Sequence, residues 1–538
     1  MKKTSILVSM LIAGMSLTIV GCQSGGYSNK NLKQVDPYLY DTNYRNMRLG
    51  SGYYAEQYTE HKNDKGEKKY VIEDVKALVI PVDFTDYPGA DLPLGEEGTR
   101  EELEKVMFGK GEDMEWYSLA GYYKSSSFGQ CNISGDVGDW YHVDTTSTEY
   151  AKEWDTAGSQ KIAIAIQDLY RSEYTIAKML DDKEKMAKYD LTQYDANKDG
   201  FIDSLILIYS APIHTTGELW WAFCWSVSGA FGKYNPELEG ANRFFWASYW
   251  FFYDGYLTKK GKYPSIPEDL PAKIVSGEAK PDVHTMTHEY GHVLGLPDYY
   301  ITDYNSSDFD GLGYLDMMDY NIGDHNAMSK SWYGWINPYY VTGSVKAKIR
   351  STTTTGDTII IPIQGEYKNT LLDQFIMIEF LTPEGVAEYD SIHPFSGNYP
   401  LYFNKAGIRV IHVDARLGVF TYNTTKKEYQ FTGFTTSTSD PGDNSYVSTA
   451  CSNTASDSCF PDYKLLEFLP RDGQSIKVHK QATSELLFKE GDVFGSNGIY
   501  ENYMMHDKAG GKTVPLGFKF EITKINDYES AEITITKI

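Results

Sequence analysis

The chain has 538 residues, more than one compact hydrophobic core normally serves, so two or more domains are expected. It carries 50 Lys and Arg against 74 Asp and Glu, which gives a net charge of −24 at pH 7. This balance argues against binding to nucleic-acid phosphates or to anionic lipid, because both need a basic surface.

The N-terminus predicts export. Lys2 and Lys3 precede the apolar run SILVSMLIAGMSLTIV, which is too short and too early for an ordinary spanning helix. The run ends in IVGC, which resembles a bacterial lipoprotein signal over residues 1–21. We therefore expect a lipid on Cys22 that anchors the protein at the cell surface. The alternative is an ordinary secretory signal with a chance cysteine. Small polar residues follow, so 22–74 is assigned to a flexible tether and an N-terminal segment.

The next part of the chain alternates strand and helix patterns. Val- and Ile-rich runs predict buried strands at 76–86 (KALVIPVDFTD) and 204–212 (SLILIYSAP). Helical spacing predicts helices at 100–109 and 159–174. Residues 220–256 are crowded with aromatic side chains, which indicates either core or the wall of a substrate groove.

From about residue 345 the pattern changes to short strands separated by turns. Examples are DTIIIPIQ, QFIMIEFL, GIRVIHVD and AEITITKI. Such spacing is typical of a β-sandwich or a similar all-β unit. We predict an α/β domain over 75–345, followed by a β-rich, sandwich-like C-terminal domain over 346–538.

The stretch HEYGHVLGLPD predicts a catalytic metal site. His288 and His292 are four residues apart, so on a helix they lie on one face and can hold one Zn²⁺. Glu289 follows the first ligand but points elsewhere around the helix, where it can act as a general base. Gly295 can end the helix in a left-handed conformation and bring Asp298 back as the third ligand. Three protein ligands leave one position open for water, as catalytic zinc requires.

Four other residues near this motif have expected roles. His284 lies one turn before His288, and an orienting or packing role is favoured over metal ligation. GLGYLDMMDYN (311–321) predicts a turn beneath the metal, with Met318 as its methionine. Tyr320 is the candidate donor to the transition-state oxyanion. Alternatively His325 takes that role, or Tyr320 only packs beneath the site.

A second metal is predicted in DANKDGFID. Oxygen-bearing side chains at alternate positions, with Gly200 at the sharp turn, fit the first half of an EF-hand-like Ca²⁺ loop. The alternative is a bare acidic turn. The expected ligands are Asp195, Asn197, Asp199 and Asp203.

Four cysteines remain after Cys22, and an even number in an exported chain predicts two disulfides. Four cysteines allow three pairings. Cys451–Cys459 is favoured because it would close a short polar loop, and it leaves Cys131–Cys224.

Several of these segments resemble the immune-inhibitor-A-type bacterial metalloproteases. The resemblance is clearest over residues 75–345, and it implies a secreted zinc endopeptidase with His288, His292 and Asp298 on zinc and Glu289 in catalysis. The segments that carry it are ALVIPVDFTD, LAGYYKSSSFGQCNISGDVGDWYHVD, YDANKDGFIDSLILIYS, HEYGHVLGLPDYY, GYLDMMDYN and SKSWYGWINP.

We therefore expect the α/β domain over 75–345 to be a zincin-type metalloprotease domain. The whole chain is expected to be an extracytoplasmic, zinc-dependent endopeptidase that cleaves proteins or glycoproteins through a zinc-activated water, with Glu289 as general base and Ca²⁺ as a second ion. Nucleic acid is not an expected partner, and the membrane is expected to be reached only through Cys22. The alternative is a non-cleaving adhesin or glycan-binding protein on a zincin scaffold. The intact Glu289 argues against it, since metal binding alone does not need that residue.

Overall fold

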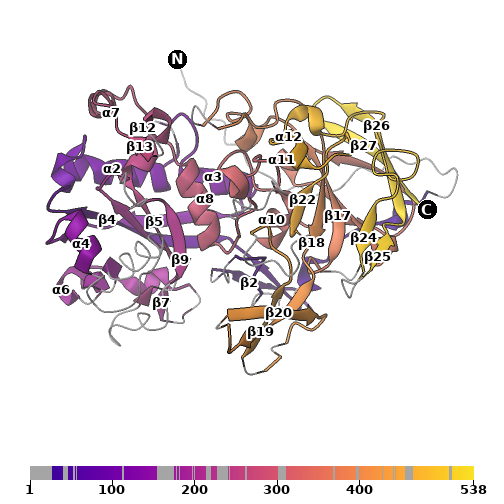
Figure 1. Cartoon of the computed structure of the whole chain (residues 1–538), viewed down its shortest axis with the longest axis horizontal. Coiled ribbons are helices and arrows are strands. Elements are labelled where there is room, and N and C mark those ends of the chain that lie inside the picture. The colour runs from indigo at the N-terminus through magenta and orange to yellow at the C-terminus, as the bar shows by residue number, and fades with distance from the viewer. Residues whose placement is uncertain are drawn as a thin grey trace, which may run out of the picture.

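A computed structural model gives the fold (Figure 1). The described residues are 27–39, 47–52, 55, 57–111, 114–153, 175–176, 178–180, 182–196, 198, 200–213, 220–226, 240–241, 243–260, 263–300, 311–367, 370–395, 399–426, 428–439, 441–442, 444–454, 464–507 and 512–538. The predicted signal peptide, Cys22, the helix predicted at 159–174, Asn197, Asp199 and Cys459 lie outside them. Within them, every helix is too short or too polar to traverse a lipid bilayer.

A mostly parallel sheet organises the N-terminal half of the molecule. The strands predicted at 76–86 and 204–212 are its neighbouring strands β4 and β8, and β9 is its single antiparallel edge strand. Both central strands are buried on both faces, which explains their continuous apolar sequence. The order is β5 (Asn132–Val137), β4 (Asp74–Phe84), β8 (Leu205–Tyr209), β11 (Arg243–Ser248) and β9 (Phe223–Ser226), with β6 (Tyr141–Val143) also paired to β4.

Alternation along the strands sends side chains into two cores. Ala77 and Val79 of β4 face the core shared with the helices, whereas Leu78 and Ile80 face a second core on the other side. The helices over the first face are α2 (Gly95–Phe108), which contains the predicted helix 100–109, α3 (Leu119–Ser126) and α8 (His284–Val293). In Figure 1 they lie along the upper side of the sheet.

The C-terminal half is β-rich, as its short strands predict. Two sheets enclose a core that includes Ile376 and Val410 from one sheet and Phe520 and Ile533 from the other. The larger is β1 (Leu32–Gln34), β14 (Tyr339–Val341), β16 (Thr358–Pro362), β17 (Gln374–Leu381), β18 (Gly407–Asp414) and β22 (Leu466–Phe468); the smaller is β15 (Val345–Arg350), β27 (Ser530–Lys537), β26 (Phe518–Asn526) and β23 (Val493–Phe494).

A three-stranded sheet extends from this half at the bottom of Figure 1. It consists of β20 (Glu428–Phe434), β19 (Leu417–Asn423) and β21 (Ser445–Thr449). The remaining elements are β2 (Thr59–Lys62), β3 (Lys68–Val71), α4 (Ser147–Glu153), α6 (Lys183–Met186), β7 (Phe201–Ile202), β10 (Gly240–Ala241), β12 (Thr258–Lys260), β13 (Tyr263–Ser265), α7 (Leu270–Ser276), α9 (Met317–Tyr320), α10 (Ala327–Trp332), α11 (Thr352–Thr355), α12 (Ile476–His479), β24 (Met504–His506) and β25 (Thr513–Pro515).

Residues 27–36 differ from the flexible tether predicted for them. Strand β1 pairs antiparallel with β14, and Leu32 and Val35 are buried. The Tyr27 hydroxyl also lies 3.0 Å from the Thr536 hydroxyl. Two apolar side chains in a polar stretch are enough to fasten this segment to the C-terminal sheet.

The predicted Cys131–Cys224 disulfide is wrong. Cys131 immediately precedes β5 and Cys224 lies in β9, and these strands form opposite edges of the sheet. Four strand spacings of about 4.8 Å separate them by roughly 19 Å. A disulfide requires Cα atoms within about 7 Å. Cys131 is accordingly a free, buried thiol. The Cys451–Cys459 pairing stays a prediction, because Cys459 lies outside the described residues.

Candidate metal centre

Helix α8 carries the first two predicted ligands. Its apolar stripe, including Met286 and Tyr290, is fully buried in the main core. The helix begins at His284, and the Asp282 carboxylate accepts a hydrogen bond from the His284 backbone N–H at 2.8 Å. Beyond the helix, Gly295 has φ +101°, which confirms the predicted left-handed turn.

His288, His292 and Asp298 converge. Asp298 Oδ1 lies 3.1 Å from His288 Nε2 and 3.2 Å from His292 Nε2. The other ring nitrogens, the two Nδ1 atoms, lie 2.8 Å from backbone carbonyl oxygens of Met317 and Leu296 respectively. A carbonyl only accepts, so each Nδ1 must donate, and each Nε2, directed at Asp298, becomes a metal ligand once it loses its proton. Two imidazoles in this tautomer and one carboxylate are a donor set that fits Zn²⁺.

The charges of these side chains shift the pKa values of His292 and Asp298. Burial opposes protonation of His292, but Asp298 outweighs it and raises the pKa of His292 to about 9. Burial alone would raise the pKa of Asp298, whereas the two imidazoles bring it well below its ordinary value. A proton and a metal ion compete for the same Nε2 atom, so metal binding at this site must displace a proton.

Glu289 is buried beside the three converging residues. Burial raises the pKa of Glu289 above its ordinary value, against the opposing influence of His288 and His292, and a backbone hydrogen bond from Cys224 of β9 lowers it. A carboxyl group whose pKa is shifted toward neutrality is suited to accept and return a proton. The edge strand and α8 therefore hold this side chain between them.

The predicted methionine turn lies against the middle of α8. Met318 is fully buried, and its sulfur occupies the space where a side chain on Gly291 would be, 2.3 Å from an ideal Cβ position. Asp316 holds the turn by accepting hydrogen bonds from the backbone N–H of Met318 and of Asn326. Asp316 thereby joins the turn to the start of α10.

The two candidate oxyanion donors differ in their exposure to solvent. Tyr320, the last residue of α9, has 39% of its surface exposed, and its ring contacts Tyr314 and Tyr399. His325 is buried among aromatic rings that include Tyr122 and Tyr333, and neither ring nitrogen has a hydrogen-bond partner among the described residues. Burial lowers the pKa of His325 well below its ordinary value. Of the two, only Tyr320 reaches solvent.

His284 is held by two carboxylates. Its Nδ1 lies 2.8 Å from Asp282, and its Nε2 lies 3.0 Å from Asp390. With both nitrogens engaged, it has no lone pair for the metal, in agreement with the orienting role favoured from the sequence. Trp116 and Phe395 stack on the two ring faces. Burial opposes its charge, but the two carboxylates raise the pKa of His284 to about 10.

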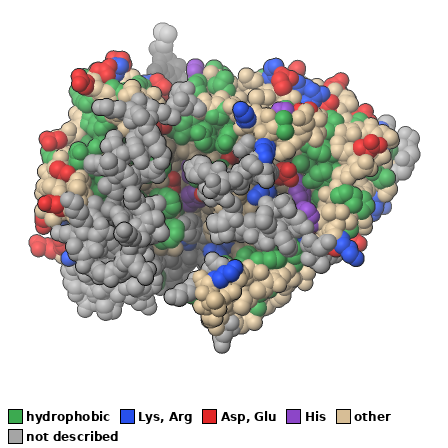
Figure 2. All heavy atoms as spheres, viewed as in Figure 1, with side chains coloured by type: hydrophobic (Ala, Val, Ile, Leu, Met, Phe, Trp, Pro, Cys, Tyr) green, Lys and Arg blue, Asp and Glu red, His purple; other side chains and the backbone are tan. Residues whose placement is uncertain are grey.

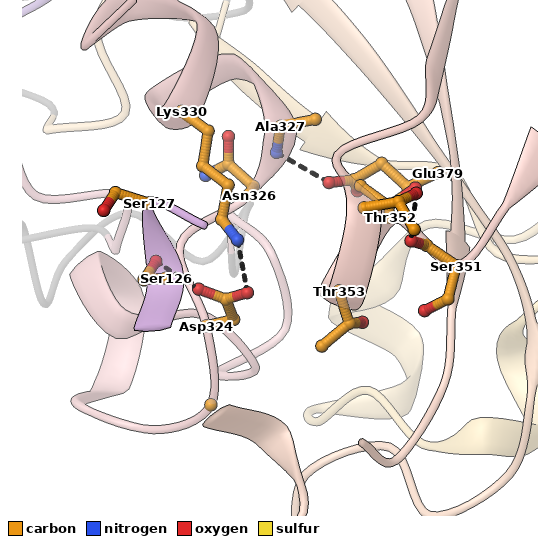
Figure 3. A network of polar contacts seen from close by, with 12 residues as sticks. Ser126, Ser127, Asp324, Asn326, Ala327, Lys330, Ser351, Thr352, Thr353 and Glu379 are labelled. Carbon is orange, nitrogen blue, oxygen red and sulfur yellow. Dashed lines mark hydrogen bonds and ion pairs between the residues drawn. The ribbon is translucent and has the colours of Figure 1, made fainter. Parts of the chain in front are cut away.

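A buried polar network holds residues 324–330, which follow the methionine turn (Figure 3). Asp324 accepts hydrogen bonds from the Ser126 hydroxyl of α3 and from the Lys330 ammonium of α10. Glu379 of β17 accepts from the Ala327 backbone N–H at 2.7 Å. The loop that follows α9 is thereby fastened to an N-terminal helix and to the C-terminal sheet at once.

The predicted calcium loop is described only in part. Asp195 accepts from the Gly200 N–H at 2.9 Å, and Asp203 accepts from the Ala196 N–H at 2.7 Å. Gly200 has φ +89°, as a sharp turn requires. Asn197 and Asp199 lie outside the described residues, so the complete set of oxygen atoms stays a prediction.

Part of the chain is similar in sequence to known proteins. Residues 59–220 match the sequence profile described as "Immune inhibitor A peptidase M6, catalytic domain". Immune inhibitor A of Bacillus thuringiensis subsp. alesti is 26% identical over 256 residues, 43% of this chain and 34% of that protein. Pre-pro-metalloprotease PrtV of Vibrio cholerae serotype O1 is 25% identical over 260 residues, 43% of this chain and 26% of that protein.

These matches confirm the resemblance seen in the sequence: residues 59–220 are similar to the catalytic domain of M6 peptidases. The chain spans about a third or less of the length of these curated relatives. The profile match ends before α8, so the metal centre rests on its own geometry.

Asp390 is the residue of this site that sequence reasoning missed. It contacts His284 and also accepts from the Gly323 backbone N–H at 2.6 Å. It lies about a hundred residues beyond the metal motif, in the unremarkable sequence AEYDSIHPF. The one available indication was His284 itself, because a buried histidine needs polar partners.

Proposed function

We propose that this chain is an extracytoplasmic zinc endopeptidase. The observation that carries the proposal is the convergence of His288, His292 and Asp298, with both Nε2 atoms directed at one carboxylate oxygen. The buried Glu289 beside them adds a proton acceptor. The matched relative named as a metalloprotease is consistent with this chemistry.

Each residue has one task in the proposed reaction. Zinc held by His288, His292 and Asp298 would polarise the scissile carbonyl and lower the pKa of a water molecule. Glu289 takes the proton from the attacking water and gives it to the leaving amine. Tyr320 donates a hydrogen bond to the oxygen that gains negative charge in the transition state.

The location of the activity is proposed from the first 22 residues. A signal that ends in IVGC would export the chain, and acylated Cys22 would hold it at the cell surface. The β1–β14 contact begins at Leu32, ten residues after Cys22, so a short tether would join the C-terminal sheet to the membrane.

The deciding experiment uses the chain from residue 23 on a mixed peptide library. Cut sites are read by mass spectrometry with and without a zinc chelator, and again for Glu289→Gln. We expect chelator-sensitive cleavage, and a loss of at least about 10²-fold in the zinc-loaded variant, the usual contribution of a positioned acid–base group. Cleavage by zinc-loaded Glu289→Gln at the wild-type rate would contradict the mechanism. A wild-type chain that binds zinc without cutting any peptide would favour the adhesin or glycan-binding alternative.

A further inference from the structure

A second group of metal-type ligands lies where β4, β6 and α2 meet. It consists of Asp83, Glu96 and His142, and one ligand atom from each lies within 4.8 Å of the other two. Among the described residues, the only other group that meets this criterion is His288, His292 and Asp298. The two groups share no residue, and the proposed protease reaction does not use the second.

The backbone fixes two of the three ligands. Asp83 and His142 are register partners in the parallel pairing of β4 with β6. His142 Nδ1 lies 2.8 Å from Asp83 Oδ1. The other Asp83 oxygen accepts from the Gly89 N–H at 2.7 Å, and Asp83 is only 3% exposed. The Asp83 carboxylate is thus rigid and has one oxygen directed at the imidazole.

The third ligand comes from the first turn of α2. The Trp140 indole N–H donates to the Glu96 backbone carbonyl at 3.1 Å, and Trp140 belongs to the chain just before β6. Gly89 makes this contact possible, because a side chain there would come within 2.9 Å of the Trp140 ring. The start of α2 is therefore held against the strand that carries His142.

The charge balance at this point favours a cation. Two carboxylates converge, and among the described residues no Lys or Arg pairs with either of them. The side chain of Glu96 makes no hydrogen bond or ion pair with the described residues. Like charges brought this close repel, and a divalent ion between them would convert the repulsion into attraction.

The first centre also brings an imidazole nitrogen close to a carboxylate oxygen. There, an imidazole nitrogen and a carboxylate oxygen that would share a metal lie 3.1 Å apart, compared with 2.8 Å for His142 and Asp83. One imidazole with two carboxylates suits Zn²⁺ and similar transition-series ions, whereas Ca²⁺ and Mg²⁺ prefer oxygen ligands alone. We propose that Asp83, Glu96 and His142 bind a second zinc-type divalent cation, which fastens the first turn of α2 to the ends of β4 and β6.

The proposal predicts how many zinc ions the wild type and its variants bind. After dialysis against Zn²⁺ and removal of loose metal on a desalting column, the chain from residue 23 should carry two zinc ions by elemental analysis. Glu96→Gln and His142→Asn should each carry one. His292→Ala should also carry one, and the double variant His142→Asn/His292→Ala none. A large excess of Ca²⁺ should leave the counts unchanged.

Another histidine–carboxylate pair, with no third ligand, supplies the control for this experiment. His61 Nε2 lies 2.8 Å from a Glu73 oxygen, but no third His, Cys, Asp or Glu ligand among the described residues joins them. His61→Asn should therefore keep both zinc ions. A wild-type count that neither Glu96→Gln nor His142→Asn lowers, whether it is one or two, overturns the proposal and leaves Asp83–His142 as a plain hydrogen bond. Because His142 is half exposed, His142→Asn is expected to fold even if Glu96→Gln does not.

Discussion

His284 on the metal helix and Asp390 in the C-terminal half form a buried ion pair, with 3.0 Å between Nε2 and Oδ1. The same carboxylate accepts from the backbone of Gly323, just after the methionine turn. One side chain from the β-rich half therefore touches both segments that frame the metal centre. It follows that the two halves of the molecule are not independent, and that the C-terminal half positions the site.

This pair predicts a pH dependence of stability. The pKa of His284 rises from 6.5 to about 10 on folding. A raised pKa contributes stability that is complete below the unfolded value and is lost as pH climbs through the folded value. The melting temperature should therefore fall between about pH 7 and pH 10. In Asp390→Asn one carboxylate no longer favours the imidazolium, so the fall should begin at a lower pH.

The partly exposed pair of Asp472 and His479, 2.9 Å apart, provides the control. Solvent screens such a pair, so Asp472→Asn should leave the pH profile of melting unchanged. Identical profiles for wild type and Asp390→Asn would show that Asp390 does not hold the charge on His284.

Tyr320→Phe should lower kcat by roughly 10-fold to 10³-fold with little change in KM, because a donor to the oxyanion acts mainly in the transition state. Its exposure at the end of α9 is compatible with contact to substrate. Initial rates over a range of peptide concentrations separate the two constants. His325→Ala is the comparison: His325 is buried in the aromatic core, so its loss should lower stability. Wild-type kcat in zinc-loaded Tyr320→Phe would remove the phenol from the mechanism.

Local patterns predicted much of this architecture. Continuous apolar runs correctly predicted β4 and β8, because a parallel strand covered on both faces has no solvent-facing positions for polar residues. The spacing of His288, His292, Gly295 and Asp298 predicted that the three candidate ligands converge, because a helix and one turn are enough to bring them together.

Contacts between distant segments could not be predicted in the same way. Asp390 approaches His284 only through the packing of one half on the other, and no local pattern encodes that approach. The pairing of cysteines failed for a related reason: sequence separation does not reveal that β5 and β9 lie at opposite edges of one sheet. The polar composition of residues 27–36 wrongly predicted a flexible tether, because the burial of Leu32 and Val35 is enough to order this segment.

Calcium should raise the melting temperature of the wild-type chain, because a ligand that binds only the folded state stabilises it by mass action. Asp199→Ala should abolish this shift. Differential scanning fluorimetry with and without millimolar CaCl₂ tests both, and Asp472→Ala, which alters a carboxylate outside the loop, should keep the shift. If Ca²⁺ did not change the melting temperature of the wild type, DANKDGFID would be an ordinary acidic turn that binds no calcium.

Cys22→Ser should release the protein from membranes or leave its signal unprocessed, because the acyl chains attach through the sulfur. Fractionation and the mass of the N-terminal peptide report the two outcomes. Cys131→Ser is the matched control, since Cys131 is a buried thiol in the catalytic half and should not affect anchoring. Unchanged membrane association without a lipid mass on Cys22 would favour the plain secretory signal.

Gly52→Ala should weaken both folding and zinc binding. An added Cβ at this position would lie 2.4 Å from the Gly295 carbonyl oxygen and 2.9 Å from the Pro297 nitrogen. These are backbone atoms of the turn that presents Asp298, so relief requires the turn itself to move. Such overpacking typically costs about 1–3 kcal/mol. The melting temperature should therefore fall, and competition with a chromophoric chelator should show a weaker affinity for zinc.

Gly255→Ala serves as the control for this change. The nearest atom to its added Cβ is the Phe395 carbonyl oxygen at 3.3 Å, so a displacement of a few tenths of an ångström accommodates the methyl group. Zinc affinity should then stay at the wild-type value. If Gly52→Ala also kept the wild-type melting temperature and affinity, the segment before β2 would not support the metal turn. A loss of affinity in Gly52→Ala alone would show that residues preceding the catalytic domain help to place its third ligand.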